Sequence, residues 1–480
     1  MKNKSIKKIS LSLLLLTLIV GVSITDSNNL FNTNPTKKVM NIDFSNPTKE
    51  LVYELSDDES YYIVASHQPI WSGKVVIPEE YNNLPVKEIA SEAFVERTWI
   101  SSIAIPKTIE KIGSGAFSMT GLKEIYFNAA NCEDFRGRNW IFYPNDTTQD
   151  IAITIGKDVE RIPERMFFPL SVDPTKKPNV NSLIFEENSS LKEIGDYAFY
   201  QLEKIKNVEF PDSLINIGDY AFYGCGIETF SFSSNLETIG KYCFANNTSL
   251  KDFTLPTSIK EINEGAFKNC KSLENLVINS EINVSDEAFK YCTSLKTVTL
   301  QNVKSIGNKV FEECKELKNI DLGENLTSIG KAAFKNCLGI TQLTLPKSLS
   351  ILNEEAFYNL SNVTSLIINC SQLENLTSGN KVFYNLGTNT DGVKVVFNSN
   401  VKVIPSQLFA SCSNEANLPN INEIVIYSGE LANIRNWAFG YLNANVTFVG
   451  KISEWKNIEI EEGNMTLSKV NCVKSYEEVA

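Results

Sequence analysis

The same seven residues, IGDYAFY, occupy positions 194–200 and again positions 217–223. They belong to a longer repeat, an apolar unit that ends in Phe and is most often written AF. From Phe199 to Phe357 every interval between these Phe residues is 22 or 23 residues, and self-similarity at such a period is typical of a solenoid. We count fifteen units, ending at Phe94, Phe117, Phe142, Phe167, Phe199, Phe222, Phe244, Phe267, Phe289, Phe311, Phe334, Phe357, Phe383, Phe409 and Phe439.

Each unit has an internal order that predicts local structure. In SLKDFTLPTSIKEINEGAF, the alternation of Leu250, Phe253 and Leu255 predicts a short strand, with Asp252 and Thr254 pointing outward. Pro often follows this strand, where its missing N–H ends the hydrogen-bonded ladder at little cost. An IG pair comes next, where we expect a corner that needs a permissive backbone. The segment through AF predicts a single helical or tight turn that directs its Phe inward.

One such unit cannot bury its own apolar face, but stacked units turn the inward Leu, Ile and Phe into continuous columns. The period lies in the range of leucine-rich repeats. The predicted fold is therefore an α/β repeat solenoid of the leucine-rich-repeat kind. It has one parallel β-strand per 22–23-residue unit and short turns or single helical turns on the opposite wall.

The pattern LxxLxLP followed by SIxxIGxxAFxxC closely resembles the BspA-type leucine-rich repeat family of surface and secreted repeat proteins. The resemblance implies an N-terminal capping hairpin in YYIVASHQPIWSGKVVIPEEYNNLPVKEIASEAF. It also implies a closing unit in VTFVGKISEWKNIEIEEGNMTLSKVNC, with Trp455 and Cys472 in the expected places. Members of the family are often adhesin-like, and some bind fibronectin or fibrinogen.

The first 25 residues have four lysines, then an apolar run, then small residues, which is the layout of a secretory signal peptide. We therefore expect an extracellular protein, secreted or at the cell surface, with no transmembrane domain beyond the signal segment. The expected divisions are a signal peptide at 1–25, a linker at 26–50, a capping hairpin at 51–88, the repeat array at 89–445, a C-terminal capping unit at 446–473 and a tail at 474–480.

Charge and residue types argue against several classes of function. The formal net charge is −12, and removal of the four lysines of the signal segment makes it −12 − 4 = −16, so binding to nucleic acid is not expected. The only histidine is His67, which leaves little from which to build a catalytic triad or a zinc site. We expect no enzyme activity, no cofactor and no metal.

Six of the ten cysteines fall three residues after a repeat Phe, at a position that Leu holds in other units: Cys225, Cys270, Cys292, Cys314, Cys337 and Cys412. This spacing predicts a buried ladder of small side chains, which we interpret as free thiols. Disulfides remain the alternative, because the chain carries an export signal.

Two irregular two-unit blocks flank the regular run of repeats. GRNWIFYPNDTTQDIAITIGKDVERIPERMF parallels GNKVFYNLGTNTDGVKVVFNSNVKVIPSQLF. Their longer loops are either binding elements or adjustments of curvature, and the sequence leaves both interpretations open.

The outward positions of the predicted strands form the candidate ligand-binding face. A solenoid presents these positions as one extended surface, and partner recognition is its usual use. We predict the following ligand-binding residues: Asn207, Glu209, Thr229, Asp252, Thr254, Asn275, Thr297, Thr299, Asn319, Asp321, Gln342 and Thr344.

The predicted function is that of a non-catalytic, monomeric, adhesin-like module. Its partner would be a protein of the extracellular matrix or the host surface. A glycan-binding module and a structural surface component are the alternatives.

Overall fold

The computed structural model describes residues 42–65, 73–135, 141–168, 177–374, 376, 379–409, 418–440 and 442–473. Met1–Val39 and Met40–Ala480 are two separate units, and every described residue lies in the second unit. The predicted signal peptide, His67, Cys412 and the C-terminal tail lie outside the described residues. The part of the chain that is described contains no helix long and apolar enough to cross a membrane.

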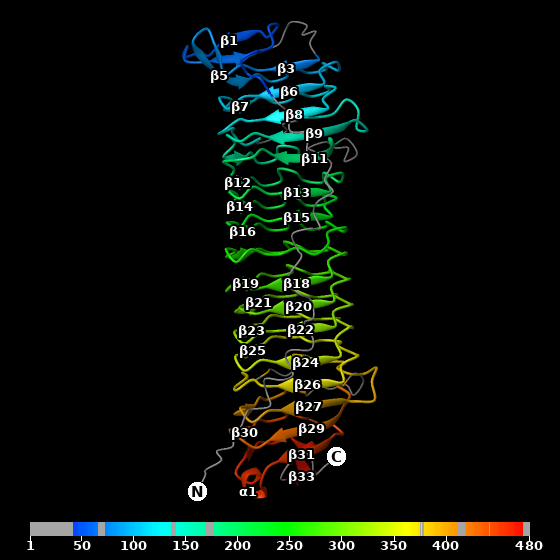
Figure 1. The fold of residues 1–480 in the computed structure, drawn as a ribbon. Coiled ribbons are helices and arrows are strands. Elements are labelled where there is room, and N and C mark those ends of the chain that lie inside the picture. Colours follow the sequence, from blue (N-terminus) through cyan, green and yellow to red (C-terminus); the bar gives the residue numbers. More distant parts are fainter. Residues whose placement is uncertain are drawn as a thin grey trace, which may run out of the picture. The chain divides into compact units, whose positions relative to one another are not determined.

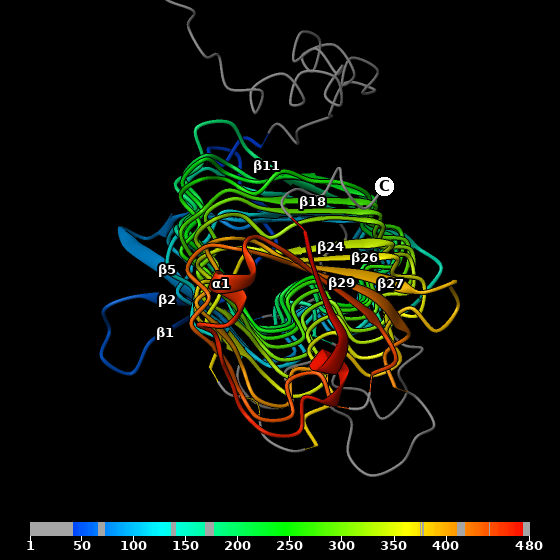
Figure 2. The ribbon, with the colours of Figure 1, turned by 90° about the horizontal axis from the view of Figure 1, so that it is seen from below.

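The described residues wind into stacked coils, seen from the side in Figure 1 and along the stack in Figure 2. Each regular coil has three walls. The strand wall consists of β3 (Lys74–Val76), β6 (Ser102–Ile105), β8 (Glu124–Phe127), β9 (Asp150–Ile155), β11 (Asn179–Phe185), β13 (Asn207–Glu209), β15 (Thr229–Ser231), β18 (Asn275–Ile278), β20 (Thr297–Leu300), β22 (Asn319–Asp321), β24 (Gln342–Leu345), β26 (Ser365–Ile368), β27 (Val393–Phe397), β29 (Ile421–Tyr427), β31 (Asn445–Val449) and β33 (Val470–Val473).

A second wall of mostly two-residue strands, the short-strand wall, was not predicted. Its parallel pairing runs continuously from β10 to β25 through nine coils. The wall consists of β5 (Leu84–Ile89), β7 (Lys111–Ile112), β10 (Arg161–Ile162), β12 (Glu193–Ile194), β14 (Asn216–Ile217), β16 (Thr238–Ile239), β17 (Glu261–Ile262), β19 (Asn283–Val284), β21 (Ser305–Ile306), β23 (Ser328–Ile329), β25 (Ile351–Leu352), β28 (Val403–Ile404), β30 (Asn433–Ile434) and β32 (Glu459–Ile460).

The ends of the stack differ from its middle. At the N-terminal end β1 pairs antiparallel with β2, and β4 pairs antiparallel with β5. At the C-terminal end Trp455 packs on Phe448 with ring centroids 5.2 Å apart. The remaining elements are β1 (Tyr53–Leu55), β2 (Tyr62–Val64), β4 (Glu80–Tyr81), α1 (Ile452–Trp455) and a 3-10 helix, η2 (Met465–Lys469).

The third wall, the turn wall, carries the repeat Phe into the core. All fifteen predicted Phe residues form one column from Phe94 to Phe439, in which successive ring centroids lie 4.9 to 6.2 Å apart. These rings are buried. Burial of one such side chain contributes roughly 1.5 to 3 kcal/mol to folding. The predicted leucine-rich repeat solenoid is confirmed, with long parallel sheets and very little helix.

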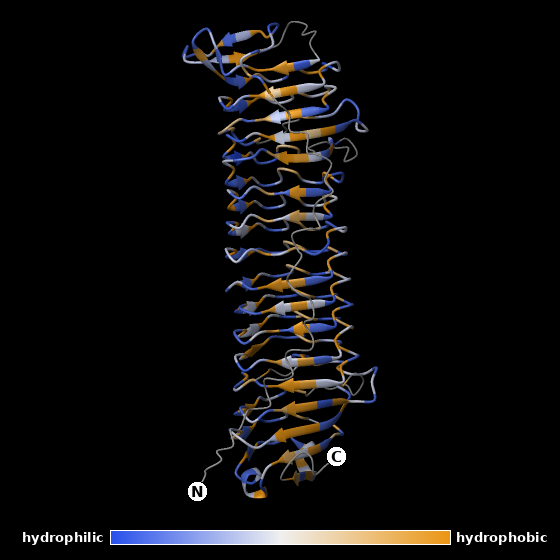
Figure 3. Ribbon diagram, in the orientation of Figure 1, coloured by the Kyte–Doolittle hydropathy of each residue, from blue (hydrophilic) through white to orange (hydrophobic). Residues whose placement is uncertain are grey.

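Hydrophobic residues follow the same inward pattern on the strand wall. Figure 3 shows β11, β27 and β29 coloured hydrophobic over most of their length. β27 lies in the second irregular block, and β11 and β29 are the strands that follow the two blocks. The pairing of each following strand with the block's own strand shifts register, at Val180/Ser182 for β11 with β9 and at Val393/Lys394 for β27 with β29. The internal duplication in the sequence thus corresponds to two similar irregularities in the strand wall.

The reason we gave for the IG glycines is wrong. They do not have the positive φ that would require a permissive backbone. A residue without a side chain is needed there because the preceding coil is close. A Cβ on Gly240 would lie 2.5 Å from the carbonyl carbon of Gly218. Positive φ occurs instead two residues before and two residues after the repeat Phe, as at Tyr197 and Gln201 around Phe199.

The cysteine ladder is buried as predicted wherever the structure describes it. Cys225, Cys270, Cys292, Cys314 and Cys337 are buried free thiols. Each Sγ–H donates to the carbonyl oxygen of the repeat Phe one coil earlier, with donor–acceptor distances of 3.1 to 3.4 Å. Asn247 holds the same position in its coil and donates to Phe222 and Phe244. The ladder therefore satisfies a row of core carbonyls that Leu could not.

Candidate functional site

The twelve predicted ligand-binding residues all lie on the strand wall, and none is buried. The alternation that predicted them holds even in the coil of Asp252 and Thr254, where Leu250 and Leu255 are buried. That coil, however, does not form the predicted strand. The structure assigns no strand to residues 251–256, so the expectation of one ladder strand in every regular unit is wrong there.

Asp252 explains how the neighbouring coil is still bonded. Its Oδ1 accepts hydrogen bonds from the backbone N–H groups of Glu274 (3.0 Å) and Asn275 (2.8 Å). Its Oδ2 accepts a third from Asn275 Nδ2 (2.6 Å). The carboxylate thus takes the place of a backbone carbonyl of the ladder. Asp252 is exposed to solvent, but we assign its side chain a structural role.

Side-chain hydrogen bonds connect several of the other predicted residues across coils. Thr229 Oγ1 donates to Asn207 Oδ1 at 2.6 Å, and Thr297 Oγ1 donates to Asn275 Oδ1 at 2.7 Å. A ligand would have to compete with these contacts, since a polar group that is already bonded gains little from a second partner. The N-terminal half of the predicted face is therefore largely occupied with holding the coils together.

The strand wall is divided into separate hydrogen-bonded sheets, with breaks between β11 and β13, at residues 251–256, and between β22 and β24. The rings of Phe185 and Phe210 lie 6.2 Å apart at the first break, and Asp252 bridges the second. At the third, no backbone hydrogen bond between the described residues joins β22 to β24. The same two coils stay together elsewhere, through the pairing of β23 with β25 and the stacking of Phe334 on Phe357 at 5.4 Å.

A shallow hollow of about 290 Å³ opens over this third break, and we call it the strand-wall hollow. Six of the twelve predicted residues line it, joined by Lys318 and Thr341, which sequence reasoning missed. The side chains of Asn319, Gln342 and Thr344 make no hydrogen bond to another described residue. The predicted residues that line the hollow are Thr297, Thr299, Asn319, Asp321, Gln342 and Thr344.

The charges in the hollow are one cation and one anion. Lys318 is exposed and forms no ion pair with a described residue. Asp321 Oδ1 accepts the backbone N–H of Gly323 at 3.0 Å, which fixes its orientation. Gly323 has φ +64° and a Cβ there would lie 2.1 Å from the carbonyl oxygen of Leu300.

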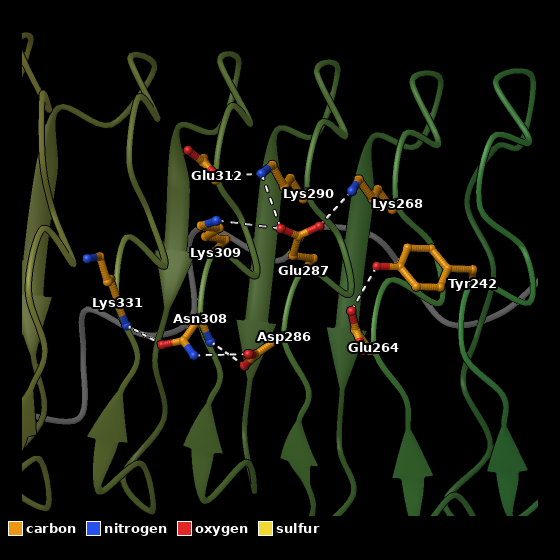
Figure 4. A network of polar contacts seen from close by, with 10 residues as sticks. All are labelled: Tyr242, Glu264, Lys268, Asp286, Glu287, Lys290, Asn308, Lys309, Glu312 and Lys331. Atoms are coloured by element: carbon orange, nitrogen blue, oxygen red, sulfur yellow. Dashed lines mark hydrogen bonds and ion pairs between the residues drawn. The ribbon is translucent and has the colours of Figure 1, made fainter.

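The polar groups of the other walls bind neighbouring coils. Figure 4 shows a network in which Glu287 lies 2.6 Å from Lys268 and 3.3 Å from Lys290, and Lys290 lies 2.8 Å from Glu312. Burial alone would raise the pKa of Glu287, but the hydrogen bond and charge of Lys268, followed by Lys290, lower it. The carboxylate therefore stays ionised and holds three consecutive coils in register.

Many surface lysines pair in the same way with a glutamate one coil away. Such pairs occur at Lys206–Glu228, Lys260–Glu237, Lys296–Glu274, Lys304–Glu281 and Lys331–Glu354, at 2.7 to 3.1 Å. Each exposed pair contributes little by itself. These pairs recur from coil to coil and therefore connect neighbouring coils along the stack.

The described residues were expected to hold no metal site, and their potential ligand side chains are scattered over the coils. No group of three or more potential ligand residues could hold a metal ion in the part of the chain that is described. Burial raises the pKa of Cys225 and of Cys292 to about 12, so these thiols are inert as nucleophiles. What the hollow offers is hydrogen bonding by hydroxyl, amide, ammonium and carboxylate groups.

The family model described as BspA type leucine-rich repeat region matches residues 75–176, 175–296, 282–416 and 377–474. The chain belongs to the BspA-type leucine-rich repeat family. This confirms the resemblance drawn from the repeat motifs. No curated protein matches the sequence.

Several solved structures are similar to this BspA-type chain. A leucine-rich repeat protein from Bacteroides ovatus is 20% identical, with a TM-score of 0.47, covering 88% of this chain and 98% of its own. A leucine-rich cell surface protein from Faecalibacterium prausnitzii is 17% identical, with a TM-score of 0.35 and coverage of 86% and 97%. The pneumococcal vaccine antigen PcpA is 18% identical, with a TM-score of 0.36 and coverage of 89% and 98%.

Proposed function

We propose that this BspA-type protein is a non-catalytic recognition module that acts outside the cell and binds a protein on a host or neighbouring cell through its strand wall. The export signal predicted at residues 1–25 supports the location. The strand-wall hollow is the observation that supports the site. Here the predicted residues Asn319, Gln342 and Thr344 are exposed and line one hollow, and their side chains make no hydrogen bond to another described residue.

The break in the ladder suits a polypeptide ligand. The backbone N–H of Thr341 has no backbone acceptor among the described residues, whereas the equivalent N–H of Thr364 donates to Thr341 O at 2.8 Å. An extended peptide segment that lies over the hollow presents main-chain acceptors that can bond such an N–H. The side chains around the hollow then supply specificity.

A glycan is the second candidate, because the lining carries Thr, Asn, Gln and Asp but no aromatic or Arg anchor of the kind that dominates protein hot spots. Free oligosaccharides separate the two candidates. If binding to a glycoprotein is abolished by its released glycans, the ligand is the sugar. If binding survives enzymatic removal of the glycans, the ligand is the polypeptide.

The test is saturation binding of the chain to immobilised fibronectin, fibrinogen and an oligosaccharide panel at physiological salt. A triple variant, Asn319→Ala with Gln342→Ala and Thr344→Ala, removes the unengaged side chains of the hollow. The matched control is Lys206→Ala with Glu228→Ala, an exposed pair elsewhere on the stack. We expect the triple variant to lose binding and the control to keep it. Equal binding by both variants, or no saturable binding to any member of the panel, would refute the proposal.

A further inference from the structure

A second hollow lies in the first irregular block, far along the strand wall from the strand-wall hollow. The loop between Phe142 and β9 bridges back to the preceding coil through Thr120 and Pro144. It encloses a pocket of about 290 Å³ beside β8, which we call the loop pocket. An apolar protein cavity of about 150 Å³ suffices to bind benzene. The loop pocket is thus large enough for one aromatic or branched aliphatic group.

The floor of the loop pocket is apolar. Leu122, Phe142 and Ile151 line it, and each is at most 6% exposed. These side chains come from two consecutive coils, so they are fixed by the core rather than by the loop. A small apolar group entering the pocket would contact a rigid, preformed surface, which is the usual character of a small-molecule site.

The rim of the loop pocket carries one positive and one negative charge. Lys123 is exposed and makes no ion pair with any described residue, unlike Lys107 and Lys111, which pair with glutamates on neighbouring coils. Asp146 also lacks a cationic partner among the described residues. Its Oδ1 accepts hydrogen bonds from the backbone N–H (2.8 Å) and the hydroxyl (2.7 Å) of Thr148. Those bonds hold the carboxylate in place and lower its pKa, so it is ionised at neutral pH.

We propose that the loop pocket binds an apolar, zwitterionic α-amino acid, with its side chain on the apolar floor, its carboxylate at Lys123 and its ammonium group at Asp146. The combination of an apolar floor with two unpaired, opposite charges on one rim carries this inference. A ligand with only one charge would leave the other rim charge unmatched. This site is independent of the strand-wall hollow, and it gives one of the irregular blocks a binding role instead of a role in curvature alone.

The experiment is a titration of the full chain with L-phenylalanine, in which binding is measured by isothermal titration calorimetry or by saturation-transfer NMR. Two analogues, 3-phenylpropionate and phenethylamine, each lack one of the two charges. We expect L-phenylalanine to bind saturably and each analogue to bind more weakly by roughly two- to fivefold, the range measured for exposed ion pairs.

Two variants test which rim charge binds the carboxylate of the ligand and which binds its ammonium group. Lys123→Met should weaken L-phenylalanine binding and remove the disadvantage of phenethylamine. Asp146→Asn keeps an oxygen for Thr148 and should remove the disadvantage of 3-phenylpropionate instead. Lys107→Met, at a lysine that is already paired with Glu79, is the control and should change nothing. Absence of saturable L-phenylalanine binding, or binding that is unchanged in both rim variants, would overturn the proposal.

Discussion

The Phe column gives the sharpest stability prediction, at Phe267. Its ring is fully buried, with centroids of Phe244 and Phe289 at 5.4 and 5.3 Å and that of Phe253 at 4.7 Å. Phe267→Ala removes the ring from between two layers that are fixed by their own hydrogen bonds, so the space cannot close. Comparable substitutions cost about 3 to 5 kcal/mol, the sum of lost transfer free energy and the cavity left behind.

The assay is urea unfolding monitored by circular dichroism. Hydrogen exchange then identifies the coils that the substitution destabilises. Arrays of repeats can unfold in parts, because each coil contacts mainly its neighbours. We therefore expect a lower midpoint and also faster amide exchange in the coils of Phe244 and Phe289 than in distant coils. Val277→Ala, at an outward side chain that is 49% exposed, is the control and should change stability by no more than about 0.5 kcal/mol. An unchanged midpoint for Phe267→Ala would refute the view that the Phe column holds the coils together.

The remaining predictions concern the thiols, the charges, the glycines and the strand break. Cys292 and its ladder neighbours should not react with a thiol reagent until the chain is unfolded, because burial raises their pKa. Because folding lowers the pKa of Glu287, its ionised carboxylate stabilises the folded chain at a pH above 4.5, the pKa of an unperturbed Glu. This stabilisation is lost as the pH falls through the pKa of Glu287 in the folded chain. Glu287→Gln should abolish that part of the acid sensitivity in pH-dependent unfolding. Gly240→Ala should lower stability by about 1 to 3 kcal/mol in urea unfolding, because its methyl group would overlap the neighbouring coil. In hydrogen exchange, the amide of Thr341 should exchange faster than that of Thr364, which is bonded across the ladder.

The parts of the fold that could be predicted are those that a single unit determines. The spacing of Phe199, Phe222 and Phe244 required one inward ring per coil, and the column follows directly from it. The inward and outward sides of each strand followed from alternation in the same way. Both features depend on the unit's own pattern, which recurs with little change.

The parts that could not be predicted depend on how two particular coils meet. The short-strand wall consists of pairs such as Asn216–Ile217, which are too brief to show a strand pattern. The strand break under the hollow depends on how β22 meets β24, and the glycine contacts depend on how closely Gly240 approaches Gly218. The sequence therefore predicted twelve equivalent surface residues, whereas inter-coil bonds engage some of them and leave others exposed around a hollow.

Hydrogen exchange on the chain alone and in the presence of a saturating member of the matrix and oligosaccharide panel tests the recognition proposal most directly. The account predicts slower exchange on binding at residues 318–321 and 341–344, around the strand-wall hollow, with the turn wall unchanged. Protection confined to the turn wall around residues 287–290, with none at the hollow, would contradict it.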